Sequence, residues 1–389
     1  MKSFDRGGLL ILSFLLVIMT GLSVPGGAPA AAGDAEGSAG RPAWEEGISY
    51  LLGMLTAKEN SLDAAKVSGL LDFALAERGA APTMKPADRE GATGAYFFTD
   101  VKAPLSKVIR YAYNPQIPAY LTLPSVVRFG GWQAKPSGTS GSFWEKVGEV
   151  KTPLLMRGIE YEEITPDLTT GAYYRYTMDR LMVLLNHKGK DFFLSVTRQK
   201  SPSTVGRKGA VIGPDSDWNS FYSGQKGLSK TGLGWVDSYM YDASSVIVLF
   251  EPFAKKQTRY MSFKWLRAGW GGINMVKREN ILEGCRRFAA GFKMVMESPQ
   301  LPEADRFIDA YARVKALPDQ ELIARLKPIG QALQKLSRTD PALANRDFQE
   351  LIQKGTYVEG MSREEREHLL MAEWMKLSLG KHSFLDKTL

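Results

Sequence analysis

Apolar residues near the start of the chain recur at the spacing of an α-helix. Between residues 44 and 58 they stand three and four positions apart, and the same spacing returns from Val67 to Ala74. A single apolar stripe of this kind is typical of a helix that packs against a larger structure. We therefore predict an N-terminal helical segment over 44–79, followed by a proline- and glycine-containing linker over 80–93.

The middle of the chain has the residue types and the alternation of β-strands. A short amphipathic helix, 104–112, follows the first strand. Two pairs of strands are separated only by 187–190 and by 242–245, and connections this short join antiparallel strands. The strands are predicted at 95–101, 125–132, 143–150, 155–164, 172–186, 192–196, 233–241, 246–250 and 258–264.

The period changes again near residue 275, where a long helix is predicted to run to residue 297. Beyond Pro302 the pattern stays helical, and Ser362 with Glu365 forms a capping box at the start of the last helix. We predict a helical C-terminal extension over 302–380. The apolar stripe of the 275–297 helix consists of Ile281, Cys285, Phe288, Phe292 and Val295.

These elements predict an α+β protein in which a curved antiparallel sheet grips a long helix. The antiparallel domain is expected to span 94–298, between the N-terminal helices and the C-terminal extension. Short connections between neighbouring strands are the reason for the antiparallel assignment. The long helix has one apolar stripe, which we expect to face the sheet.

The first 32 residues have the pattern of a secretory signal peptide. Lys2 and Arg6 precede an apolar run from Leu9 to Val24, and small residues follow it. We expect cleavage near Ala32, a disordered linker over 33–43, and a periplasmic or extracellular location. The alternative is a retained membrane anchor, although the run is shorter than the roughly 20 apolar residues of a spanning helix.

Composition adds few constraints. Hydrophobic residues make up 44% and charged residues 24% of the chain, which is ordinary for a folded protein. Cys285 is the only cysteine, so no internal disulfide forms, and its place on an apolar stripe predicts a buried thiol. The net charge of +8 is compatible with an anionic membrane surface, but no dense basic stripe indicates nucleic acid.

No motif assigns a cofactor, a metal or a catalytic centre. His187, His368 and His382 come from separate elements, and we expect ordinary surface residues. The stretch 215–219 resembles the start of a calcium loop but lacks its later glycine and glutamate. The stretch 224–231 resembles a phosphate loop with Ser229 in place of a required glycine. We therefore expect no cofactor and no metal.

Two carboxylates, Glu160 and Glu162, share one face of a predicted strand. A pair of this kind performs acid–base chemistry in glycosidases. A solvent-facing edge strand is the favoured interpretation, because charged side chains are rarely buried. A hydrolase is the least favoured class, since nucleophile, base and oxyanion donors cannot be assigned together. The sequence leans against an enzyme without deciding the question.

Two strands have aromatic faces that could line a cavity for an apolar ligand. Arg180 or Asp237 could orient a polar head group there, or the two could pair with each other. A core filled by side chains under a covering helix is the alternative. The candidate ligand-binding residues are Tyr174, Tyr176, Met178 and Arg180 on one strand, and Trp235, Asp237 and Tyr239 on the other.

Residues 95–297 run strand, short helix, antiparallel strands and long helix, and Val101 to Ile109 reads V-K-A-P-L-S-K-V-I. This order resembles the helix-grip fold of START-like and polyketide-cyclase-like domains, and the short stretch is similar to the strand-to-helix opening of that superfamily. The resemblance implies a curved sheet that encloses a hydrophobic pocket with its C-terminal helix, and a lipid-binding role. It assigns no catalytic residue.

The sequence thus favours an exported protein that binds a lipid or another apolar small molecule between the sheet and the 275–297 helix. The rival hypothesis is a non-enzymatic envelope scaffold or interaction protein. Its helical extension, 302–380, would dock onto a protein partner. An apolar stripe left exposed on that extension would favour the rival.

Overall fold

The computed structural model describes residues 41–385, with gaps at 58–60, 78–83, 134–135, 139–141, 166–171, 231–233, 254–255 and 345. The predicted signal peptide, 1–32, and most of the predicted linker, 33–43, lie outside the described residues. Residues Arg41–Leu389 form one compact unit. Among the described helices, none combines the length and the apolar character that a membrane crossing requires.

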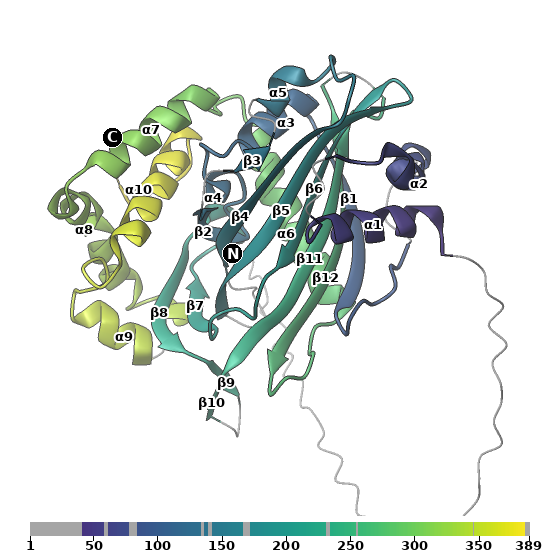
Figure 1. Cartoon of the computed structure of the whole chain (residues 1–389). Helices are drawn as coiled ribbons and strands as arrows, with labels where there is room; N and C mark the ends of the chain where they lie inside the picture. Colours follow the sequence, from purple (N-terminus) through teal and green to yellow (C-terminus); the bar gives the residue numbers. More distant parts are fainter. Residues whose placement is uncertain are drawn as a thin grey trace, which may run out of the picture. The chain divides into compact units, whose positions relative to one another are not determined.

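An antiparallel sheet organises this unit (Figure 1). Its main path has the strand order β1-β12-β11-β6-β5-β4-β2, and every neighbouring pair runs antiparallel. The predicted hairpin through 187–190 is confirmed, because His187 pairs with Lys190 across a two-residue turn that contains Gly189 at φ 76°. The strands are β1 (Thr93–Val101), β2 (Val127–Trp132), β3 (Ser137–Gly138), β4 (Leu154–Ile164), β5 (Ala172–His187), β6 (Lys190–Gln199), β7 (Arg207–Val211), β8 (Ser220–Lys226), β9 (Leu228–Lys230), β10 (Gly234–Val236), β11 (Ser238–Phe250) and β12 (Thr258–Trp270).

The two N-terminal helices cover one face of the sheet. Phe192, Leu194 and Val196 of β6 are fully buried in the core between the sheet and these helices. Trp44 of the first helix stacks on Phe263 of β12, with ring centroids 5.7 Å apart. This face is therefore closed by ordinary apolar packing. The helices are α1 (Ala43–Met54) and α2 (Ala64–Ala76).

The long helix α6 lies against the opposite face of the sheet. Its C-terminal half enters the main core, where Phe292 and Val295 are fully buried. Gly291 permits this close approach, because a Cβ there would lie 2.3 Å from Ser125 Oγ. The N-terminal half of α6 packs separately, through Ile281 and a small cluster. The helices on this face include α3 (Leu105–Ala112), α4 (Ala119–Thr122) and α6 (Arg278–Met296).

The chain after α6 is helical, as predicted, and its apolar residues join the same core as the sheet. Phe307 and Leu326 are fully buried there. The predicted capping box is present, because the Glu365 N–H donates to Ser362 Oγ at 3.3 Å and the Ser362 N–H donates to Glu365 Oε2 at 2.7 Å. The helices are α7 (Ala304–Ala316), α8 (Asp319–Leu336), α9 (Arg346–Gln353) and α10 (Arg363–Ser378).

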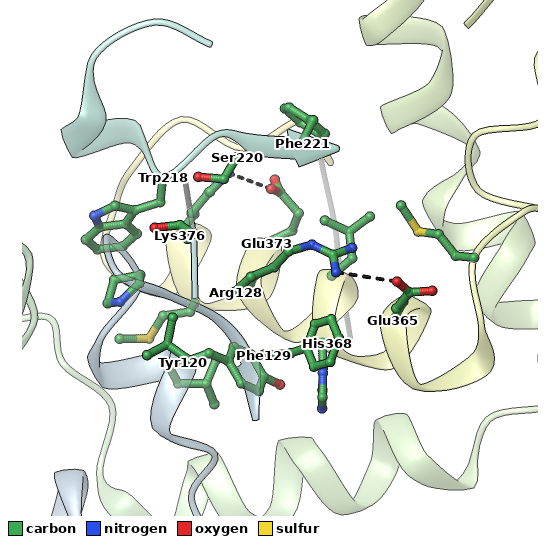
Figure 2. A pocket seen from close by; sticks show the side chains of 18 of the residues that line it. Tyr120, Arg128, Phe129, Trp218, Ser220, Phe221, Glu365, His368, Glu373 and Lys376 are labelled. Carbon is green, nitrogen blue, oxygen red and sulfur yellow. Dashed lines mark hydrogen bonds and ion pairs between the residues drawn. The ribbon is translucent and has the colours of Figure 1, made fainter. Parts of the chain in front are cut away.

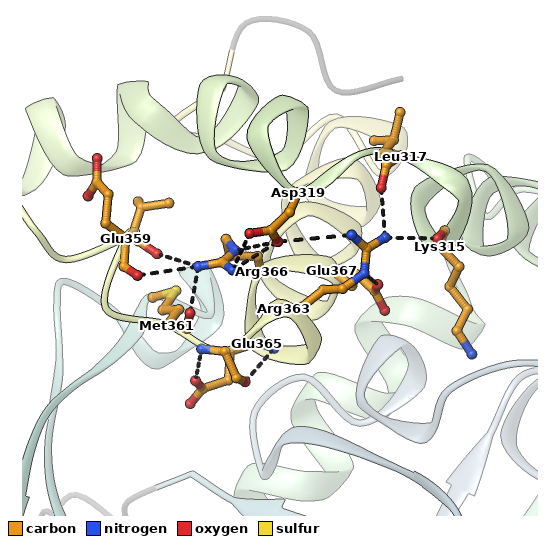
Figure 3. Close-up of polar contacts among 11 residues, drawn as sticks. Lys315, Leu317, Asp319, Glu359, Met361, Arg363, Glu365, Arg366 and Glu367 are labelled. Atoms are coloured by element: carbon orange, nitrogen blue, oxygen red, sulfur yellow. Dashed lines mark hydrogen bonds and ion pairs between the residues drawn. The ribbon is translucent and has the colours of Figure 1, made fainter.

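Two arginines at the start of α10 hold it against the connection between α7 and α8 (Figure 3). Arg366 donates to both carboxylate oxygens of Asp319 at 2.8 Å. Arg363 donates to the backbone oxygens of Lys315 and Leu317 at 3.0 and 2.6 Å. Charge-assisted hydrogen bonds of this kind are about twice as strong as neutral ones. They fix the direction in which α10 leaves the loop.

Two predicted elements are wrong. Residues 143–150 do not form a strand, and Phe143–Lys146 is instead one helical turn, α5, whose phenylalanine is buried. The predicted hairpin through 242–245 is one continuous strand, Ser238–Phe250. Small polar residues there resemble a turn in sequence, but Ser245 pairs with both neighbouring strands and lies buried between them.

Candidate ligand cavity between the sheet and helix α6

A cavity of about 490 Å³ lies between the N-terminal half of α6 and the sheet. This volume lies within the range of roughly 300–1,000 Å³ that small-molecule sites occupy. The single cysteine, Cys285, faces the cavity, and its thiol is buried as the apolar stripe predicted. Burial raises the pKa of that thiol. Apolar side chains form much of the wall, among them Phe97, Ile164, Met240, Leu266, Ile281 and Phe288.

Four of the seven predicted ligand-binding residues line this cavity. Tyr174, Tyr176, Met178 and Arg180 alternate along β5, and all four face it. The Tyr174 hydroxyl donates to Ser238 Oγ at 3.0 Å. The wall is therefore amphiphilic, with ring faces beside hydroxyl groups. Whether these residues bind a ligand stays a prediction.

The predicted residues of the second strand are placed differently. Asp237 is exposed, and Tyr239 stacks on Tyr241 with ring centroids 6.0 Å apart, so neither belongs to the lining. Ser238 and Met240 line the cavity instead. A shift of one residue exchanges the two faces of a strand. The prediction therefore chose the outward-facing set of residues on this strand as the inward-facing set.

The residues of this predicted strand fall on two elements, β10 and β11. Trp235 belongs to β10, and its side chain lies outside the described part of the chain. A bulge between Met240 and Asp242 reverses the alternation of β11, so that Ala243 and Ser245 also face the cavity. No residue pattern marks the bulge in advance.

A half-buried ion pair contributes to the wall of the cavity. Arg180 donates from Nε to Glu160 Oε2 at 2.6 Å and from Nη1 to Ser195 Oγ at 2.5 Å. Burial raises the pKa of the Glu160 carboxyl, while the guanidinium opposes that shift. Glu162 lines the cavity and accepts a hydrogen bond from Tyr176. The expected solvent-facing acidic strand is therefore wrong, because these carboxylates have internal partners.

A polar row crosses the floor of the cavity. By strand register, Thr197 lies beside Arg180, Ser245 beside Thr197, and Lys264 beside Ser245. The Thr197 and Ser245 hydroxyls are 2.7 Å apart and share a hydrogen bond. Ser262, two positions from Lys264 on the same face, is 4% exposed, and its hydroxyl has no partner among the described residues.

This polar row was not predicted, although β6 contains the signal for it. Phe192, Leu194 and Val196 alternate with Ser195 and Thr197. Such alternation is usually typical of a strand with one solvated face. Here β6 lies between β5 and β11 with both faces covered. A buried strand with one hydroxyl-bearing face predicts a polar-lined interior.

A second, smaller cavity of about 60 Å³ lies among β2, β8, α4 and α10 (Figure 2). His368 lines it and is 3% exposed, so the expected surface position is wrong. Its ring packs 4.7 Å from Tyr120 and 5.1 Å from Phe129, and burial lowers the pKa of His368 to about 3. The charged groups around this cavity are paired, as in Lys376 with Glu373 at 2.6 Å. A space this small suits ordered water.

Metal-ligating residues do not gather at either cavity. Across the described residues, no three histidine, cysteine, aspartate or glutamate side chains are grouped as a metal site requires. The residues that line the larger cavity are suited to apolar contact and hydrogen bonding. Such a lining can contact a molecule that has an apolar body and polar atoms.

No protein-family model matches the chain, and no curated protein matches it. Solved structures that match include the human StarD13 (DLC2) lipid transfer and protein localization domain, at 11% sequence identity and a TM-score of 0.23. That match covers 60% of this chain and 94% of the other. At this TM-score the likeness supports no functional assignment. The helix-grip arrangement predicted for 95–297 is present in the chain itself, as an antiparallel sheet with α6 across a cavity.

Proposed function

We propose that this protein binds a lipid or another elongated apolar molecule in the cavity between the sheet and α6. One observation carries the proposal: a cavity of about 490 Å³ with an amphiphilic wall lies between the sheet and α6 and opens to the surface at Met275. Protein interiors are close-packed, and voids larger than a water molecule are few. A hollow of this size beneath a helix is what a ligand-binding protein requires.

The loop between β12 and α6 gives the ligand a route to the surface. Met275 lines the cavity and is 46% exposed, and Ile273 beside it is 60% exposed. Gly271 and Gly272 both have positive φ, at 60° and 79°. Exposed apolar side chains at the edge of a cavity favour contact with an apolar ligand source. Such a source includes a membrane surface.

We also propose that this binding takes place outside the cytosol. The support is the sequence of residues 1–32, whose charged start, apolar run and small residues match an export signal. A carrier in that compartment would move or hold apolar molecules between the membrane and its surroundings. Fusion of residues 1–32 to a reporter that is active only after export tests this part. A reporter that stays inactive would refute it.

The rival hypothesis of a docking scaffold predicts an exposed apolar stripe on the C-terminal extension, and the described residues of α7 to α10 do not show one. The large apolar side chains that are exposed in the described residues are Phe253, Ile273, Met275 and Met294. None of them belongs to the helices α7 to α10. The described C-terminal helices turn their apolar residues into the common core instead. We therefore favour the carrier.

Native mass spectrometry of the full chain, purified without detergent, tests the proposal. We expect a bound apolar mass at one per chain, which organic extraction releases and added dodecanoate replaces. Gly284 lines the cavity, and no atom lies within 4 Å of a Cβ built on it, so Gly284→Leu should fill the space and remove the bound mass. Gly330→Leu, at an equally open glycine of α8, is the control and should keep it. Absence of any bound mass, before and after dodecanoate, would refute the carrier.

A further inference from the structure

We infer that the ligand has an anionic head group and that Lys264 binds it. This inference depends on the proposed function. Three cationic side chains line the cavity, and two of them have carboxylate partners. Arg180 pairs with Glu160 at 2.6 Å, and Arg287 pairs with Asp215 at 2.5 Å. Lys264 has no hydrogen-bond or ion-pair partner among the described residues.

The position of Lys264 directs its ammonium into the cavity. Lys264 lies on the inward face of β12, between Ser245 of β11 and Ala95 of β1. Cys285 of α6 is on the opposite wall, and the charge of Lys264 acts on its thiol. Burial raises the pKa of that thiol, and Lys264 partly opposes the shift. Lys264 on the sheet and Cys285 on α6 thus line the same cavity.

Two hydroxyl-bearing residues, Ser262 and Ser245, lie beside Lys264 on the cavity face of the sheet. The Ser262 hydroxyl is buried without a partner on the same face of the same strand. The Ser245 hydroxyl shares one hydrogen bond with Thr197 and retains further capacity. An ammonium flanked by hydroxyls can donate several hydrogen bonds to one anionic oxygen group. A carboxylate or a phosphate has the oxygens to accept them.

The distribution of charge also favours an anion at this position. Arg180 has Glu160 and Glu162 beside it, so that end of the polar row already has its negative charge. Lys264, at the other end of the row, is half-buried and has none. A cation that leaves bulk water without a counter-ion is unfavourable. A ligand anion would supply the missing charge while its apolar part fills the remaining cavity.

Binding measurements on the delipidated full chain test this inference. Dodecanoate, dodecyl phosphate and 1-dodecanol have the same tail and differ in the head group. We expect the wild-type protein to bind at least one of the two anions about ten-fold or more tightly than 1-dodecanol. The tighter of the two anions identifies the head group as carboxylate or phosphate. Isothermal titration calorimetry measures all three affinities.

Variants at Lys264 separate charge from shape. Lys264→Met should lose the preference for the anion while its affinity for 1-dodecanol, which also reports correct folding, stays unchanged. Lys264→Arg should keep the preference, because the charge remains. Lys327→Met, at an exposed lysine of α8, is the matched control and should behave as wild type.

The outcomes distinguish the two proposals. Equal binding of anions and 1-dodecanol by the wild-type protein would refute the head-group inference and leave the carrier intact. A preference that survives in Lys264→Met would also refute the role of Lys264. Failure of the wild-type protein to bind any of the three probes would instead refute the carrier itself.

Discussion

Gly284→Leu should make the protein more stable while it removes ligand binding. Gly284 is an interior residue of α6, where glycine costs backbone entropy. It lines the cavity, and the space around a Cβ at this position is open. A leucine side chain would therefore grow into the hollow and occupy volume that the ligand needs. Stability and function change in opposite directions only if the hollow exists.

The expected magnitude follows from two contributions. Leucine exceeds glycine in helix propensity by about 0.8 kcal/mol. Full burial of a leucine side chain contributes about 1.5–3 kcal/mol, and the half-buried position of Gly284 suggests about 1 kcal/mol of that. The free energy of unfolding of the ligand-free protein should therefore rise by about 2 kcal/mol.

Urea unfolding followed by circular dichroism, with and without dodecanoate, measures both effects. Ligand at 100 times its Kd should stabilise the wild-type protein by about 2.7 kcal/mol, because it binds only the folded state. The variant should gain almost nothing from the ligand. Gly330→Leu should keep the full ligand response. A destabilised Gly284→Leu protein would show that the space is not there, and an undiminished ligand response would show that the ligand binds elsewhere.

Two further predictions concern the buried polar groups of α10. Lys376→Met should lower the free energy of unfolding by about 3–5 kcal/mol, because it leaves the Glu373 carboxylate, 1% exposed, without its cation. Urea unfolding should show that the double variant Lys376→Met with Glu373→Leu recovers most of this loss. A single variant as stable as the wild-type protein would contradict the prediction. Burial lowers the pKa of His368 from 6.5 to about 3. Between pH 6.5 and about pH 3, His368 is therefore protonated in the unfolded chain and neutral in the folded chain. The free energy of unfolding should therefore fall as the pH drops through this window, by about 2 kcal/mol at pH 5. The His368→Phe variant should not show this pH-dependent loss. The exposed His382→Phe variant should retain the wild-type pH dependence, and an equal slope in wild type and His368→Phe would refute the assignment.

Elements with a long, regular apolar period could be predicted from the sequence. The stripe of α6 through Ile281 and Phe292 set both its length and the face that it buries. The inward residues of β5 were also predictable, since the alternation from Tyr174 to Arg180 is uninterrupted. In both cases one period holds over the whole element, so one choice of face fixes every side chain.

Features that depend on distant contacts could not be predicted. The bulge after Met240 changes which residues of β11 face inward, and it is a property of the pairing with β12 rather than of local residue types. The buried charges of α10 look solvated in sequence, because partners such as Asn219 for Lys376 are far away along the chain. His368 was misplaced for a related reason: its ring packs against Tyr120 and Phe129, which are far away along the chain.

Both faces of the sheet carry packed cores, and the cavity occupies only the part beneath the N-terminal half of α6. The face toward α1 and α2 is apolar along β6 and β12, where Phe192, Phe263 and Trp265 are fully buried. Because that face supplies dense packing, the opposite face can hold hydroxyls, an ion pair and an unpartnered Lys264 around an open volume. A sheet solvated on one side would have only one face with which to build a core, and a hollow there would remove much of its stabilisation. The core under the N-terminal helices and the main core under the C-terminal half of α6 together supply the packing that lets the remaining volume stay open.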